Sequence, residues 1–247
     1  MNFSIDLNCD MGEGMPNDAL IMPFISSANI ACGLHAGNST IMQQTIELAM
    51  QYDVAIGAHP SFPDKENFGR TNMNFSPEQV CAIVKEQIEI LAEIAAKNNC
   101  KLHHVKPHGA LYNMAAKDED LSAAICNAIK EIDTSLLVYA LSGSKLIDVA
   151  QATGLRTYNE AFADRTYQAD GSLTPRSIPN ALLLTEDSVT KQVLQIIHEG
   201  SVTTADGKII PLKATTICVH GDGEHALVFV RAIYDKLIAN NITLRSS

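Results

Sequence analysis

Short apolar runs recur along the chain, and each is followed by a polar, often glycine-containing loop and usually by a helical pattern. Within these runs polar and apolar positions do not alternate, which is the pattern of strands covered on both faces. The runs are Ile5–Leu7, Ala28–Cys32, Val54–Ala58, Leu102–Val105, Leu136–Leu141, Leu155–Tyr158 and Thr216–Val219. A strand followed by a helix, repeated about seven times, predicts a parallel sheet that is either closed into a barrel or left open.

The clearest helix begins at Ser76, where a serine N-cap, a proline at the first position and Gln79 form a capping box. Its apolar residues form one stripe at three- and four-residue spacing: Val80, Val84, Ile88, Leu91 and Ala95. Other helices are expected after Asn38-Ser39, near Asp120, after Ser142-Gly143, at Thr185-Glu186-Asp187 and after Asp222. Gly154 and Gly200 stand where helix C-terminal caps belong.

The composition of the chain is even from end to end, without a linker or a low-complexity segment. We therefore expect one domain over residues 1–247, a length that single α/β barrels commonly reach. Asp206-Gly207 lies between residues that favour strands, which predicts a small inserted hairpin near residues 201–212.

Charge and cysteine content narrow the class of protein. The chain has 18 Lys and Arg against 28 Asp and Glu, a net charge of −10 that disfavours non-specific binding to nucleic acid or to anionic membranes. Residues 19–46 carry no charge, but their many polar groups indicate a buried strand and loop rather than a membrane span. The 6 cysteines contain no Cys-x-x-Cys pair, and no signal peptide is visible, so we expect a reducing, cytoplasmic location.

Ionisable and amide side chains gather just after the apolar runs. They are, in chain order, Asn8, Asp10, Glu13, His35, His59, Lys106, His108, Glu160, Asp164, Arg165, His220 and Asp222. Because parallel strands deliver their C-terminal ends to one rim, these residues should meet there although they are far apart in sequence. Four of the 8 histidines follow such runs, which packing alone explains poorly.

Each of these residues also has a structural interpretation. Asp10 and Glu13 could hold a glycine turn, and Asp222 could be a helix N-cap. Lys106 is costly to place at the end of a buried strand unless it has an anionic partner, which favours a role in the site. Among the remaining histidines, His103 is expected to be structural and His104 is ambiguous. His198 and His225 have the spacing of helix-surface residues.

Two kinds of site chemistry are compatible with these residues. Asp10, His59 and His108 could bind a divalent metal, although no compact ligand motif such as His-Glu-x-x-His is present. A metal-free site with His or Asp as the base and Lys as the electrostatic stabiliser is equally compatible.

Arg165 and Arg176 could hold an anionic substrate group or could form surface ion pairs. Neither a P-loop nor a dinucleotide-binding Gly-x-Gly-x-x-Gly is found.

The same segments resemble the lactam-utilisation (LamB/YcsF) family over the whole chain and in the expected order. The matching stretches are Ile5–Gly14, Ser27–Gly37, Ala55–Pro60, His104–Asn113, Phe162–Arg165 with Asp170-Gly171 and Pro175-Arg176, and Cys218–Asp222. The resemblance implies a seven-stranded (β/α) barrel, TIM-barrel-like and similar to the glycoside hydrolase and polysaccharide deacetylase group. It also implies ATP-dependent opening of 5-oxo-L-proline to L-glutamate, carried out together with 5-oxoprolinase subunits B and C.

On that hypothesis ATP is a co-substrate that the partner subunits help to bind, and this chain supplies the site of ring opening. Asp10 or His59 would be the general base, Lys106 and His108 would stabilise negative charge, and His220 with Asp222 would form an orienting pair. Asn8, Glu13, His35, Arg165 and Arg176 would contact substrate, with Arg165 or Arg176 anchoring its carboxylate. The alternatives are a stand-alone, metal-dependent amide or acetyl hydrolase of the deacetylase type and a non-catalytic scaffold subunit.

Overall fold

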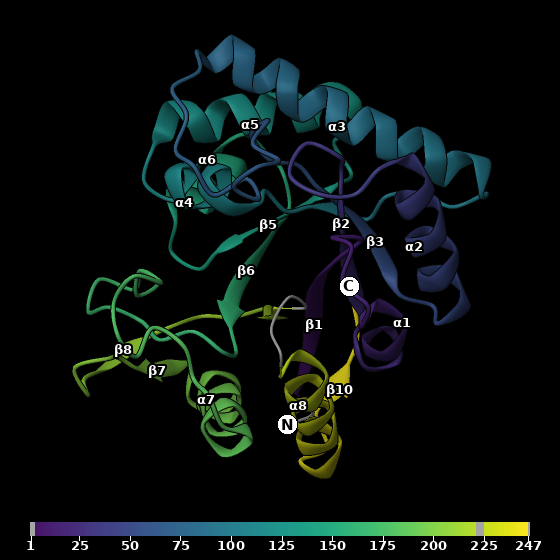
Figure 1. Ribbon diagram of the computed structural model, residues 1–247. Helices are drawn as coiled ribbons and strands as arrows, with labels where there is room; N and C mark the ends of the chain where they lie inside the picture. The colour runs from purple at the N-terminus through teal and green to yellow at the C-terminus, as the bar shows by residue number, and fades with distance from the viewer. Residues whose placement is uncertain (1–2, 221–224, 247) are drawn as a thin grey trace.

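The barrel predicted from the family resemblance is present. A computed structural model describes residues 3–220 and 225–246, and in these residues parallel strands close into a ring (Figure 1). The ring contains β1 (Ser4–Met11), β2 (Ser27–Ala31), β3 (Ala55–His59), β4 (His104–Val105), β5 (Leu137–Leu141), β6 (Thr157–Phe162) and β9 (Thr216–Val219). Each strand pairs with the next, and β9 closes the ring by pairing with β1, where Asp6 lies opposite Thr216.

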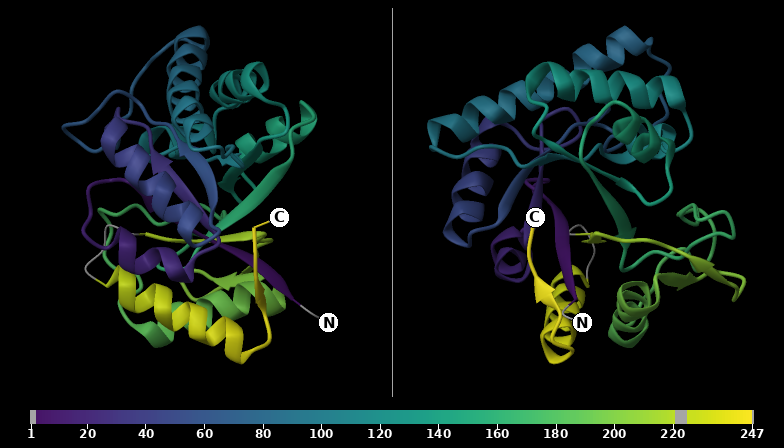
Figure 2. Two further views of the ribbon diagram at one scale, coloured as in Figure 1. Left: turned by 90° about the vertical axis from the view of Figure 1, so that its right-hand side faces the viewer. Right: turned by 180° about the vertical axis from the view of Figure 1, so that it is seen from behind.

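Helices cover the outside of the ring (Figure 2). They are α1 (Asp18–Ile21), the 3-10 turn η1 (Met22–Phe24), α2 (Ser39–Gln51), α3 (Pro77–Lys97), α4 (Gly109–Ala115), α5 (Glu119–Ile132), α6 (Lys145–Ala152), α7 (Glu186–Glu199) and α8 (Ala226–Ala239). The capping box predicted at Ser76 is formed, and the predicted apolar stripe of α3 is buried. Gly200 caps α7 in the left-handed conformation, as its position in the sequence predicts.

Three short strands lie outside the ring. β7 (Ser201–Thr203) and β8 (Ile209–Pro211) pair antiparallel, and β10 (Thr243–Leu244) adds a parallel strand at the start of β1. In the part of the chain that the structure describes, no helix is both long and apolar enough to cross a membrane.

The first strand corrects a sequence-based expectation. It extends to Met11 instead of ending at Leu7, so Asn8 and Asp10 lie within the strand and not in the loop after it. Along β1 polar residues do alternate with apolar ones, yet both sets are buried. The apolar set belongs to the hydrophobic core, while the polar set forms hydrogen bonds to other strands of the ring. The barrel interior is therefore polar.

The N-terminal half of this interior is a hydrogen-bond network of one carboxyl group and several hydroxyl groups, which we call the barrel floor: Asp6, Ser26, Ser27, Tyr139 and Thr216. Asp6 accepts hydrogen bonds from Ser26 Oγ at 2.5 Å, Ser27 Oγ at 2.7 Å and Thr216 Oγ1 at 2.6 Å. Burial raises the pKa of Asp6 from its ordinary value, and the hydroxyl donors oppose this shift.

Candidate functional site

A buried set of charges lies at the C-terminal end of the ring. Lys106, directly after β4, places its Nζ 2.8 Å from Asp10 Oδ1 of β1 and 2.8 Å from Glu160 Oε1 of β6. We call these three residues the charge triad. Burial alone would lower the pKa of Lys106, but Asp10 and Glu160 hold it well above its usual range. Burial alone would raise the pKa of Asp10, but His59 and Lys106 hold it well below its usual range.

Neutral side chains fix the triad in place. Asn29 Nδ2 donates to Asp10 Oδ1 at 2.8 Å and to Asn8 Oδ1 at 2.8 Å, and His104 Nε2 donates to Asn29 Oδ1 at 2.7 Å. The His104 ring fills the space over Gly57, where an added Cβ would lie 2.1 Å from its Nε2 atom. This contact explains the glycine in the middle of β3.

Beside the triad lies a second group, which we call the His/Glu cluster: Glu13, His35, His59 and His108. All four side chains are buried, and one ligand atom from each lies within 4.8 Å of all the others. Glu13 Oε1 is 3.4 Å from His35 Nε2, 4.0 Å from His59 Nε2 and 3.6 Å from His108 Nδ1. Burial, followed by the neighbouring histidines, lowers the pKa of His35 strongly and that of His108 to about 3, so both rings are neutral at pH 7.

The set expected from the sequence to bind a metal overlaps with this cluster. His59 and His108 belong to both, whereas Glu13 and His35 are in the cluster and Asp10 is not. Asp10 Oδ2 lies 3.3 Å from His59 Nε2, while its other oxygen is held by Lys106 and Asn29. The side chain of Asp10 therefore links the cluster to the triad.

His220 contacts a carboxylate in the loop after β6. Its Nδ1 atom lies 2.9 Å from both carboxylate oxygens of Asp164, in the loop after β6. Burial would raise the pKa of Asp164, but His220 lowers it below its usual value. The expected partner, Asp222, lies outside the described residues.

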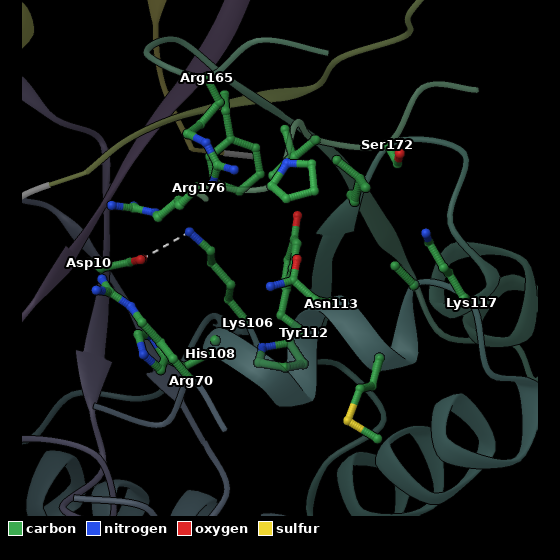
Figure 3. A pocket seen from close by; sticks show the side chains of 18 of the residues that line it. Asp10, Arg70, Lys106, His108, Tyr112, Asn113, Lys117, Arg165, Ser172 and Arg176 are labelled. Carbon is green, nitrogen blue, oxygen red and sulfur yellow. Dashed lines mark hydrogen bonds and ion pairs between the residues drawn. The ribbon is translucent and has the colours of Figure 1, made fainter. Parts of the chain in front are cut away.

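Asp10 and Lys106 of the triad and His59 and His108 of the cluster line a pocket of about 750 Å³. Figure 3 shows Asp10, Lys106 and His108 at this pocket. Its lining includes five Lys or Arg side chains against two Asp side chains, in a protein whose net charge is −10. The basic residues are Arg70, Lys106, Lys117, Arg165 and Arg176. Arg165 is 8% exposed and donates to Thr174 O at 2.6 Å, and its Nε atom has no hydrogen-bond partner among the described residues.

The structure thus brings together most of the residues expected at the rim. Asp10, Lys106 and Glu160 form the triad, Asn8 accepts a hydrogen bond from Lys106, the His/Glu cluster lies beside them, and Arg165, Arg176 and His220 line the pocket. The sequence predicted that Glu160 lies at the rim but gave it no role, and it did not single out Asn29 or Tyr112, whose Oη donates to Glu160 Oε2 at 2.6 Å. The signal that could have found Asn29 is a side-chain amide within a short, fully buried strand.

The fold and the site define a parallel (β/α) barrel with a cationic pocket at the C-terminal mouth, the position where such barrels carry their active sites. The LamB/YcsF family profile matches residues 5–247. The chain belongs to the LamB/YcsF family.

Relatives and solved structures support this assignment. A protein of Bordetella parapertussis, named as the A subunit of 5-oxoprolinase, is 50% identical, with 100% of both chains covered. One of Tolumonas auensis with the same name is 49% identical, with 98% of each chain covered. The crystal structure of a lactam utilization protein from Thermus thermophilus superimposes with a TM-score of 0.94 at 37% identity, covering 99% of this chain and 100% of that one.

More distant structures share the fold alone. A family 4 carbohydrate esterase from Streptomyces lividans superimposes with a TM-score of 0.55 at 8% identity, covering 98% of this chain and 92% of that one. This agrees with the deacetylase-like barrel that the resemblance implies.

Proposed function

We propose that this chain is the A subunit of an ATP-dependent 5-oxoprolinase and that its pocket is where the lactam ring of 5-oxo-L-proline is opened to give L-glutamate. The observation that carries the proposal is the end-to-end similarity to proteins named as the A subunit of 5-oxoprolinase. The structure adds a pocket whose charge suits an anionic substrate.

The excess of positive charge in the pocket supports a substrate with a carboxylate and, after activation, a phosphoryl group. Burial lowers the pKa of Arg165 from its ordinary value, and the positive charge of the neighbouring Arg176 lowers it further. Two neighbouring guanidinium groups that line one pocket favour binding of an anion that neutralises both. The pocket volume lies in the range that holds drug-sized ligands, which is more than a five-membered ring needs.

ATP is expected to act through the partner subunits. A five-membered lactam is a resonance-stabilised amide whose ring closure is entropically favoured, so its hydrolysis benefits from phosphorylation of the carbonyl oxygen. The sequence contains no recognisable nucleotide-binding loop. We therefore assign activation of the lactam to subunits B and C together with ATP, and attack of water and opening of the ring to this chain.

The contacts in the triad modify the role first expected for Lys106. An ammonium group has three protons, and Lys106 Nζ donates to Asp10 Oδ1 at 2.8 Å, Asn8 Oδ1 at 3.2 Å and Cys218 Sγ at 3.1 Å. We therefore assign Lys106 to holding Asp10 ionised and in position, and we assign substrate charge to the arginines. The proton acceptor is Asp10 Oδ2, which lies 3.3 Å from His59 Nε2.

The direct test is 5-oxoproline-dependent glutamate formation by this chain alone and with subunits B and C, with and without ATP. Activity is expected only from the full set with ATP. Arg176→Gln should raise KM about 10- to 100-fold, since hydrogen bonds to charged groups contribute about 1.5–3 kcal/mol. Arg156→Gln, which removes an exposed arginine outside the pocket, is the matched control.

Two other outcomes would replace the proposal. Activity of the chain alone towards simple amides or acetylated sugars, abolished by a chelator, would identify a stand-alone hydrolase; the His/Glu cluster is the observation that favours it. Unchanged lactam opening by a complex that contains rim variants would identify a scaffold subunit.

A further inference from the structure

The His/Glu cluster presents an electrostatic problem that its hydrogen bonds do not solve. His59 Nδ1 lies 2.7 Å from the carbonyl oxygen of Lys106, and His108 Nε2 lies 2.9 Å from the carbonyl oxygen of Phe68. A carbonyl oxygen can only accept, so both of these ring nitrogens must carry their protons. In neutral rings the other nitrogens, His59 Nε2 and His108 Nδ1, then hold lone pairs.

These two nitrogens face each other at 2.9 Å. Two lone pairs at this distance repel, and the repulsion is removed either by a proton that the two nitrogens share or by a metal cation near both of them. His35 lies against the same point: its ring is stacked on that of His108 at 3.9 Å, and neither of its nitrogens has a hydrogen-bond partner among the described residues. Glu13 adds a carboxylate oxygen within 4.0 Å of all three rings.

We propose that Glu13, His35, His59 and His108 bind one divalent transition-metal ion, with zinc as the best fit. Three imidazoles and one carboxylate are a donor set that suits zinc, and hydrogen bonds from ligand histidines to backbone carbonyls are typical of such sites. With zinc–ligand bonds of about 2.0–2.1 Å, ligand atoms in a tetrahedron lie about 3.3 Å apart. The separations of 2.9, 3.4, 3.6 and 4.0 Å bracket that value.

The site ties together the ends of four neighbouring strands. Glu13 follows β1, His35 follows β2, His59 ends β3 and His108 follows β4. Four protein ligands fill a tetrahedral shell, so the ion stabilises the rim on which Asp10 lies. This inference does not depend on the proposed reaction, because metal binding can be measured without any substrate.

The first experiment is metal analysis of the chain purified without a metal-affinity step or chelator. We expect about one equivalent of zinc per chain. Removal of the ion should lower Tm, and added zinc should restore it, since a ligand that binds only the folded state stabilises it. Cobalt added to the stripped chain should give the visible absorption of a four-coordinate ion.

Variants locate the ion. His35→Ala should weaken binding by at least about 10- to 100-fold, the loss that follows removal of even an outer-shell partner. His198→Ala, which removes an exposed histidine of α7, should bind as the wild type does. His35→Cys should keep cobalt and add a thiolate-to-cobalt charge-transfer band, which a purely structural role of His35 would not produce.

The proposal is overturned if the wild-type chain contains no metal and neither zinc nor cobalt changes its Tm or its spectrum. A proton shared by His59 and His108 would then replace the ion. It is also overturned if His35→Ala retains the full metal content. A metal-bound chain that does not support lactam opening would refute the proposed function while leaving this site intact.

Discussion

The two halves of the barrel interior are both buried and polar, yet they differ in how their polar groups are satisfied. In the barrel floor Asp6 accepts hydrogen bonds from three hydroxyl groups, which oppose the rise in its pKa that burial causes. At the rim Asp10 and Lys106 are held ionised by each other, and the ring nitrogens of His35 lack hydrogen-bond partners among the described residues. The floor is a closed network, whereas the rim holds charge and donor atoms ready for a ligand.

Burial of polar groups therefore does not by itself mark a functional site. A fully hydrogen-bonded network stabilises and specifies a fold. Groups held in a charged state or left without partners, at the edge of a pocket, cost stability and are retained for another reason. Substitutions in the floor should therefore change stability, and substitutions at the rim should change activity as well.

The largest effect is expected from Lys106→Ala. The change leaves Asp10 and Glu160 buried without their shared cation, which should cost about 3–5 kcal/mol of unfolding free energy. Lactam opening by the full complex should fall about 10²- to 10³-fold. Urea unfolding and glutamate formation measure the two effects, with Lys101→Ala at an exposed site as the control. If more than about a tenth of the turnover remains, the rim is not the reaction centre.

In the floor, Asp6→Ala should cost about 3 kcal/mol, because the hydroxyls of Ser26, Ser27 and Thr216 lose their acceptor and an unsatisfied buried group costs about 1–3 kcal/mol. Asp6→Asn keeps an acceptor oxygen and should cost less. Urea unfolding gives the stability, and turnover per folded molecule should stay near the wild-type value. A selective loss of turnover would contradict the separation of floor and rim.

Gly57→Ala tests the contact between Gly57 of β3 and the ring of His104. The new methyl group would overlap the ring of His104, so we expect about 1–3 kcal/mol of destabilisation from overpacking. His104→Ala removes the overlap, and the double variant should recover part of the loss in a double-mutant cycle. Additive effects of the two changes would show that the ring is not what requires a glycine at this position.

The smallest effect is a change of stability with pH. Burial lowers the pKa of His104 well below its ordinary value, so below pH about 6.5 the unfolded chain binds a proton that the folded chain does not. His104 thus makes its full contribution to the unfolding free energy above that pH. Its contribution falls as the pH is lowered, by at most about 1.4 kcal/mol per pH unit. In urea unfolding between pH 6.5 and 5, His104→Gln should reduce this slope. Identical slopes for the two proteins would contradict the assignment.

The sequence predicted those features that depend on neighbours along the chain. The start of α3 was predictable because its capping box and apolar stripe lie within one segment. The burial of Lys106 with an anionic partner was also predictable, because a charge directly after an apolar run requires one. The identity of that partner was not predictable from the sequence, because Glu160 lies 54 positions away, on a strand that extends beyond its predicted end at Tyr158.

The amino-acid sequence by itself therefore determined the helices, the approximate strands and the kinds of side chain that gather at the rim. Only the tertiary structure decided that the sheet closes through β1 and β9, that His220 lies against Asp164, and that His59 Nε2 and His108 Nδ1 face each other at 2.9 Å. Local patterns arise from the geometry of one helix or strand. Pairing across the ring depends on strand register and side-chain orientation, which the chain acquires only when residues far apart in sequence pack together.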